Sequence, residues 1–337
     1  MSKIAEKVRR NFLMYANQKV INLADIRAAK KMLKTDQAAM TAITKDLESN
    51  VEDSLHKMYI VAISLIGATM YKLVNIKDFS AFQKQIDHFS DLYMPSYPPM
   101  SPITESYYHT FELLDLAVGT GQERETLTSI FLAIADLLKL SPMERRLVEN
   151  LHHSKMSLYE VREQKDDCLL LRELVTGTES WCKSFSDYPA KVGELWYVRV
   201  VPGIPEYFDY SLVLTTPYVL LYYSNDDWTQ FFARHQVTKE NFHQFMKYGP
   251  AVDFWSEFIF FGYVNYHPGA VYLRGLPDWP HTQPCHKQYK GPAITKLARK
   301  KTGSSAAKTT TKIKSAKSAQ TDTHVPASAR GEDLLQD

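Results

Sequence analysis

The side chains with the clearest potential for chemistry lie near the C-terminal end of the sequence. His281, Cys285 and His286 fall within six residues, and His267 precedes them by fourteen. Imidazole and thiolate groups are zinc ligands, and a zinc site needs three or four of them to converge on one point. Their spacing matches no common zinc-binding pattern, so they also fit a polar, proline-rich surface segment. We favour the surface segment, predict no cofactor, and rank a metal-dependent hydrolase third among the functional hypotheses.

A second candidate is the aromatic-rich stretch from Tyr248 to Trp279. Most of its rings fit a core helix packed against a sheet, which is the interpretation we favour for them. Trp279 stands between an aspartate and a proline, and Arg274 precedes it by five residues. A surface tryptophan beside an arginine is typical of sites that bind a peptide or a nucleobase. We therefore predict that Arg274 and Trp279 belong to a binding surface.

The third candidate is a lysine-rich C-terminal tail. Residues 291–337 hold nine Lys or Arg against four Asp or Glu, whereas residues 1–290 hold 31 basic and 34 acidic residues. Basic side chains bind phosphate backbones by releasing counterions, without reading a base sequence. The lysines that we expect to do this are Lys300, Lys301, Lys308, Lys312 and Lys314. Weak, non-specific nucleic-acid binding through the tail is the second functional hypothesis, and a purely solubilising tail is its alternative.

Patterns typical of catalysis do not emerge elsewhere in the sequence. No Gly-x-Ser-x-Gly motif is present, and the adjacent aspartates at 166–167 and 226–227 fit a turn and a helix start better than an acid–base pair. The Gly-x-Gly at 119–121 follows an expected helix, whereas a dinucleotide-binding loop follows a strand. We predict no catalytic residue, and the leading hypothesis is a binding or scaffold protein with a protein partner.

The elements that must position these side chains follow from the spacing of apolar residues. Over residues 1–155 they recur every three or four positions, which predicts an all-helical N-terminal domain. From residue 156 they alternate, and turn residues separate short runs. Residues 156–290 are therefore predicted to form an α+β domain, with a small antiparallel β-sheet or partly open barrel and packed helices. Residues 291–337 lack the apolar side chains for a core and are predicted to be a disordered basic tail.

Composition also indicates the setting of the protein. The chain has three cysteines, too few for a disulfide framework, and its charged N-terminus lacks a secretory signal pattern. Its most apolar stretch, residues 58–71, is shorter than the roughly 20 residues that a membrane-spanning helix needs. We predict a cytoplasmic protein that does not bind membranes.

One segment resembles a known module. The run of residues 171–177, Leu-Arg-Glu-Leu-Val-Thr-Gly, is followed by Gly-Glu-Leu-Trp-Tyr-Val-Arg-Val-Val-Pro at 193–202. Together they resemble a small β-module of uncharacterised bacterial proteins that have a helical N-terminal half. Some of these proteins carry a SEC-C-type metal-binding motif beside the module, and this sequence lacks the cysteines of that motif. Glu173 and Glu194 stand where the module often has aspartate. The resemblance implies an architecture of strands and turns and no activity.

Overall fold

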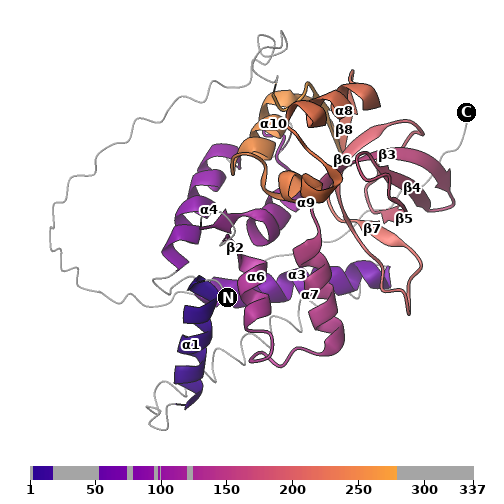
Figure 1. Ribbon diagram of the computed structural model, residues 1–337. Helices are drawn as coiled ribbons and strands as arrows, with labels where there is room; N and C mark the ends of the chain where they lie inside the picture. The colour runs from indigo at the N-terminus through magenta and orange to yellow at the C-terminus, as the bar shows by residue number, and fades with distance from the viewer. Residues whose placement is uncertain are drawn as a thin grey trace, which may run out of the picture. The chain divides into compact units, whose positions relative to one another are not determined.

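Helices and strands are interleaved along the chain (Figure 1). The structure is a computed structural model that describes residues 3–17, 53–73, 79–94, 98, 100–119 and 124–278. Its helices are α1 (Lys3–Asn17), α3 (Ser54–Leu73), α4 (Ser80–Tyr93), α5 (Glu105–Thr110), the π-helical turn η2 (Phe111–Asp115), α6 (Leu127–Ala133), α7 (Pro142–His153), α8 (Asn225–Arg234), α9 (Lys239–Tyr248) and α10 (Phe254–Gly262). Its strands are β1 (Ala117–Val118), β2 (Glu125–Thr126), β3 (Met156–Lys165), β4 (Cys168–Glu173), β5 (Glu179–Ser184), β6 (Leu195–Val201), β7 (Ser211–Val213), β8 (Tyr218–Leu221), β9 (Tyr263–His267) and β10 (Ala270–Arg274).

The prediction of an all-helical N-terminal domain is wrong. Strands β1 and β2 pair antiparallel within it, and α5 ends in a π-helical turn instead of continuing. The apolar side chain of Val118 sits where a continued helix would also place one, so the spacing did not reveal the change. Glu125 of β2 is buried and accepts hydrogen bonds from the backbone nitrogens of Ile4 and Ala5 at the start of α1. A carboxylate at a helix N-terminus is favourable, because it satisfies N–H groups that lack intrahelical partners.

Five strands form a closed barrel in the order β3-β4-β5-β7-β6, and β6 returns to β3. This circular order, with its one parallel pair between β5 and β7, is the connectivity of five-stranded Greek-key barrels of the OB type. Strand β3 makes closure possible because it bends. Its register with β4 shifts between Val161 and Glu163, so that residues 156–160 pair with β6 and residues 159–165 pair with β4.

The second part of the fold prediction is therefore also wrong, because the sheet is neither wholly antiparallel nor partly open. The barrel continues through β8, β10 and β9 into an eight-stranded sheet, in which β8 and β10 are parallel. Alternating side chains indicate which residues share a face of a strand. They do not indicate which strands become neighbours, because pairing depends on contacts between distant parts of the chain.

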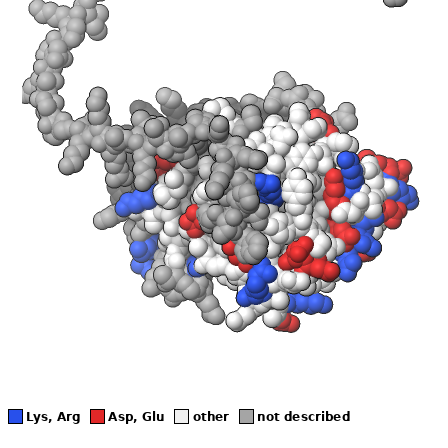
Figure 2. Space-filling model, turned by 90° about the horizontal axis from the view of Figure 1, so that it is seen from above, with Lys and Arg blue, Asp and Glu red and all other residues white. Residues whose placement is uncertain are grey.

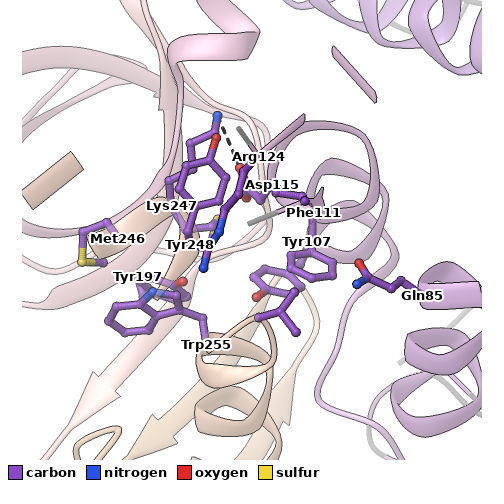
Figure 3. Close-up of a pocket in the computed structure, with 14 residues that line it drawn as sticks. Gln85, Tyr107, Phe111, Asp115, Arg124, Tyr197, Met246, Lys247, Tyr248 and Trp255 are labelled. Carbon is purple, nitrogen blue, oxygen red and sulfur yellow. Dashed lines mark ion pairs between the residues drawn. The ribbon is translucent and has the colours of Figure 1, made fainter. Parts of the chain in front are cut away.

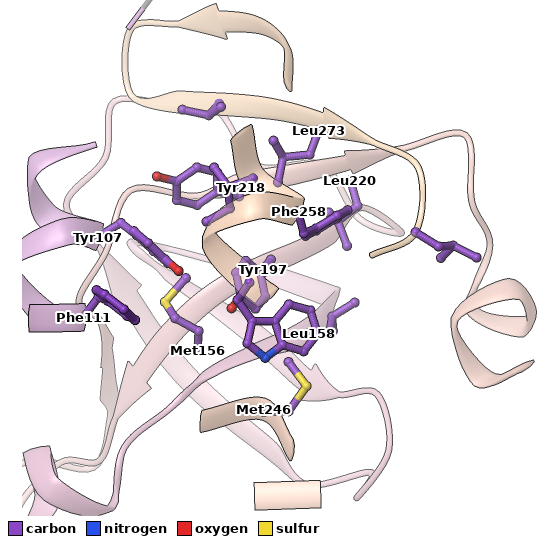
Figure 4. Close-up of a cluster of buried hydrophobic side chains, with 14 of the residues drawn as sticks. Tyr107, Phe111, Met156, Leu158, Tyr197, Tyr218, Leu220, Met246, Phe258 and Leu273 are labelled. Atoms are coloured by element: carbon purple, nitrogen blue, oxygen red, sulfur yellow. The ribbon is translucent and has the colours of Figure 1, made fainter. Parts of the chain in front are cut away.

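The buried side chains form three clusters. One fills the barrel interior around Trp196 and Val198, and a second joins the helices that precede β3 to Val201 and Leu212. The third lies between the outer surface of β3, β6, β8 and β10 and the helices α4, α5, α8, α9 and α10 (Figure 4). Strand β6 is buried on both sides, so its outward-facing side chains point into this helix-covered layer.

The described residues all belong to one compact unit. A boundary between two folding domains at residue 155 stays a prediction, and the tail that we expected to be disordered lies outside the described residues. No helix in the described ranges is long and apolar enough to cross a membrane.

Candidate functional site

The structure places one of the four candidate metal ligands. His267 is exposed at the end of β9, where its Nδ1 lies 2.6 Å from the carbonyl oxygen of Pro268. His281, Cys285 and His286 lie outside the described residues. Within the described part of the chain, no group of three or more His, Cys, Asp or Glu side chains could hold a metal ion.

The predicted binding surface is only partly described. Arg274 ends β10 and is half-buried, and its Nε has no hydrogen-bond partner among the described residues. Trp279 lies outside the described residues, as do Lys300, Lys301, Lys308, Lys312 and Lys314. The predicted contact surface of Arg274 and Trp279 therefore stays a prediction.

A different site emerges where the helices meet the outer surface of the barrel. A cavity of about 150 Å³ lies there, which we call the Asp115 cavity (Figure 3). Its walls come from α4, α5, η2, β3, β6, α9 and α10, and include Gln85, Tyr107, Phe111, Met156, Tyr197 and Trp255. A cavity of roughly 150 Å³ is large enough for a benzene-sized molecule.

Aromatic rings shape the apolar walls of the cavity. Tyr107 and Phe111 stack nearly parallel, with ring centroids 6.1 Å apart and planes 4° apart. Tyr197 stacks on Trp255 at 5.2 Å. The hydroxyl groups of Tyr107 and Tyr197 point toward the same region (Figures 3 and 4). Burial raises the pKa of both hydroxyls, so both stay protonated and can donate hydrogen bonds.

A buried cluster of charges adjoins these rings. Asp115, the last residue of η2, forms an ion pair with Arg199 of β6, and the guanidinium also donates to Ser154 Oγ at 2.9 Å. Lys247 of α9 lies 3.6 Å from Asp115 Oδ1. All three charged side chains are at least nine-tenths buried, with exposed fractions of 0% for Arg199, 5% for Asp115 and 2% for Lys247.

Local structure explains why Lys247 is held there. Helix α7 begins at a capping box formed by Ser141 and Glu144 and ends at Ser154. Carbonyl groups at the end of a helix lack intrahelical partners. Lys247 Nζ donates to the carbonyl oxygens of His152 and Ser154, the latter at 3.0 Å. Burial lowers the pKa of Lys247 to about 8. The Asp115 carboxylate opposes this shift, because it stabilises the charged amine.

Two buried polar atoms at the cavity make no hydrogen bond to any part of the chain that the structure describes. Among the described residues, Asp115 Oδ1 and Gln85 Oε1 are buried and have no hydrogen-bond partner. A buried unsatisfied polar atom costs about 1–3 kcal/mol. Both residues line the cavity.

Sequence reasoning missed this site, although it left signals. Arg199 interrupts an apolar run in a strand, and Lys247 follows a buried methionine in an amphipathic helix. A charged side chain within a buried pattern requires a partner, and Asp115 directly follows two buried leucines. These signals mark charged residues whose burial must be offset by a partner of opposite charge or by hydrogen bonds. They do not identify which ones meet.

Figure 2 shows how the charged side chains of the described residues are distributed over one face of the molecule. On that face, acidic and basic side chains are interspersed toward one end and uncharged residues fill the middle. A nucleic-acid-binding surface would instead collect basic residues. Comparisons of the chain with protein-family models, with curated proteins and with solved structures find no match.

Proposed function

We propose that this protein is a binding protein for a small organic molecule, and that the molecule occupies the Asp115 cavity. The observation that supports this most directly is an aromatic-walled space beside a buried cluster of three charged side chains. Ligand sites in proteins combine mostly apolar walls with a few convergent polar groups, as this cavity does. The buried charges around it come from three different elements, η2, β6 and α9, which hold one another in place.

Ligand-observed NMR with a library of aromatic fragments of about ten non-hydrogen atoms tests the proposal. Several fragments should bind the full-length protein. The substitution Val252→Phe should abolish the binding of these fragments, because Val252 lines the cavity. Val252 is 45% exposed, so a larger side chain can narrow the cavity without disturbing the core.

Val264→Phe is the matched control. Val264 lies in β9, is 41% exposed and does not line the cavity. The Val264→Phe variant should bind the fragments as the unaltered protein does. Equal loss of binding in both variants, or fragments that bind all three proteins equally, would place the ligand elsewhere and reject the proposal.

A cytoplasmic setting is part of the same proposal. Cys168 and Cys182 are both free thiols, and unpaired thiols are usual in reducing compartments. A protein partner stays a prediction. Co-purification of a stoichiometric partner with the tagged full-length chain would support it, and a monodisperse monomer purified without companions would count against it.

A further inference from the structure

We propose that the ligand of the Asp115 cavity carries one negative charge, and that it is a small aromatic carboxylate. This inference rests on the proposed function, because it names the chemistry that the same cavity selects. It starts from the imbalance of charge around the cavity. Among the described residues, the two buried cations Arg199 and Lys247 share one buried carboxylate, that of Asp115.

The neighbouring charges do not correct the imbalance. Lys155 and Glu173 form a separate pair at 2.7 Å, with both side chains largely buried, and so add no net charge. Two neighbouring imidazoles, His152 and His243, are held neutral because burial lowers the pKa of each to about 4. The buried cluster therefore keeps an excess of one positive charge. An uncompensated charge in a low-dielectric interior is costly, so an anion in the adjoining cavity would be favoured.

A third cation stands beside the cavity. Arg124 lines it, and the guanidinium carbon lies 5.9 Å from the centre of the Tyr248 ring. Its side chain is exposed, so it can turn toward a ligand without losing a core contact. Figure 3 shows Arg124, Lys247 and Tyr197 around the same space. A guanidinium matches the two oxygens of a carboxylate with parallel hydrogen bonds.

The size and walls of the cavity narrow the class of anion. A volume of about 150 Å³ admits one small ring, and flanking rings from Tyr107 and Trp255 suit a planar apolar body. The hydroxyl group of Tyr197 can donate to an anion, whereas that of Tyr107 lies 3.4 Å from Ser256 Oγ. A carboxylate brings one negative charge, which equals the buried excess. A phosphate monoester brings about 1.5 to 2 negative charges at neutral pH and is the less suitable group.

The experiment compares three probes by isothermal titration calorimetry on the full-length protein: benzoate, its neutral isostere benzamide, and phenyl phosphate. Benzoate should bind at least about tenfold more tightly than benzamide, a difference of about 1.4 kcal/mol. Arg124→Gln should reduce this preference by several fold without weakening benzamide. Arg145→Gln is the matched control, since Arg145 is exposed and pairs with Glu149 on α7, outside the cavity lining.

The outcomes separate this inference from the proposal on which it rests. Equal binding of benzoate and benzamide, lost in Val252→Phe, would overturn the anion preference and leave the ligand site standing. Tighter binding of phenyl phosphate than of benzoate would replace the carboxylate by a phosphate monoester. Absence of binding by all three probes and by the fragment library would reject the ligand site and the anion preference together.

Discussion

The substitution Asp115→Asn isolates the electrostatic role of the buried cluster. Asparagine keeps the shape of aspartate and one carbonyl-type oxygen, so packing changes little while the carboxylate that pairs with Arg199 and Lys247 disappears. Two unit charges 3.6 Å apart interact by about 4.6 kcal/mol at an effective dielectric constant of about 20. Breaking a buried ion pair costs about 3–5 kcal/mol. We expect Asp115→Asn to lower the free energy of unfolding by a value in that range.

Urea unfolding followed by tryptophan fluorescence measures this effect. With a slope near 3 kcal/mol per molar urea, the midpoint should fall by roughly 1–1.7 M. Asp136→Asn is the control, because Asp136 pairs with Arg9 at 2.7 Å on the surface, with 53% of its side chain exposed. Exposed pairs contribute about 0–1 kcal/mol, so its midpoint should hardly move.

A double-mutant cycle assigns the effect to its pair. Lys247→Met removes the amine and also leaves the two backbone carbonyls that it bonds without a donor. The free energy lost at these carbonyls is the same with and without Asp115→Asn, so it cancels from the coupling energy. We expect a coupling energy of about 1.5–4.6 kcal/mol between Asp115 and Lys247, from the range measured for close charge pairs up to the Coulomb energy above. A loss below about 1 kcal/mol for Asp115→Asn, or a coupling within about 0.5 kcal/mol of zero, would refute the argument that this cluster is held by buried charge.

Three further predictions concern other parts of the chain. Gly203→Ala should destabilise the protein by about 1–3 kcal/mol in thermal unfolding, because its Cβ would overlap the carbonyl oxygen of Tyr210. Gly67→Ala, in the middle of helix α3, should be neutral or stabilising, because its Cβ would meet only the side chain of Leu113, at 3.9 Å. Burial lowers the pKa of His152 to about 4, so below about pH 6.5 this imidazole binds a proton more readily in the unfolded chain than in the folded protein. The free energy of unfolding should therefore fall by about 1–2 kcal/mol, after solvent screening, as the pH drops from about 6.5 to 4. Urea titrations at several pH values should show a flatter slope for His152→Gln. The full-length protein should bind DNA more tightly than residues 1–290 do, with a steeper salt dependence, in fluorescence anisotropy; equal binding by both would reject a role for the tail.

The sequence by itself determined where local periodicity changes. Apolar residues spaced three or four apart mark the helices before residue 156, and alternation begins where β3 begins, at Met156. These patterns are local, because a helix or strand exposes a face through residues only a few positions apart. The short strands β1 and β2 escaped the same reasoning, since two extended residues are too few to show a period.

The tertiary structure alone decided which strands are neighbours and which charges meet. The barrel closes because a bulge bends β3 toward β6, and nothing in the alternation of either strand specifies that pairing. Asp115 and Arg199 are 84 positions apart, and each reads in the sequence as a charge in an apolar run. Their contact, and the cavity beside it, arise when a helical layer packs on the barrel. The physical reason is that long-range packing brings together groups whose separation along the chain carries no information about their distance in space.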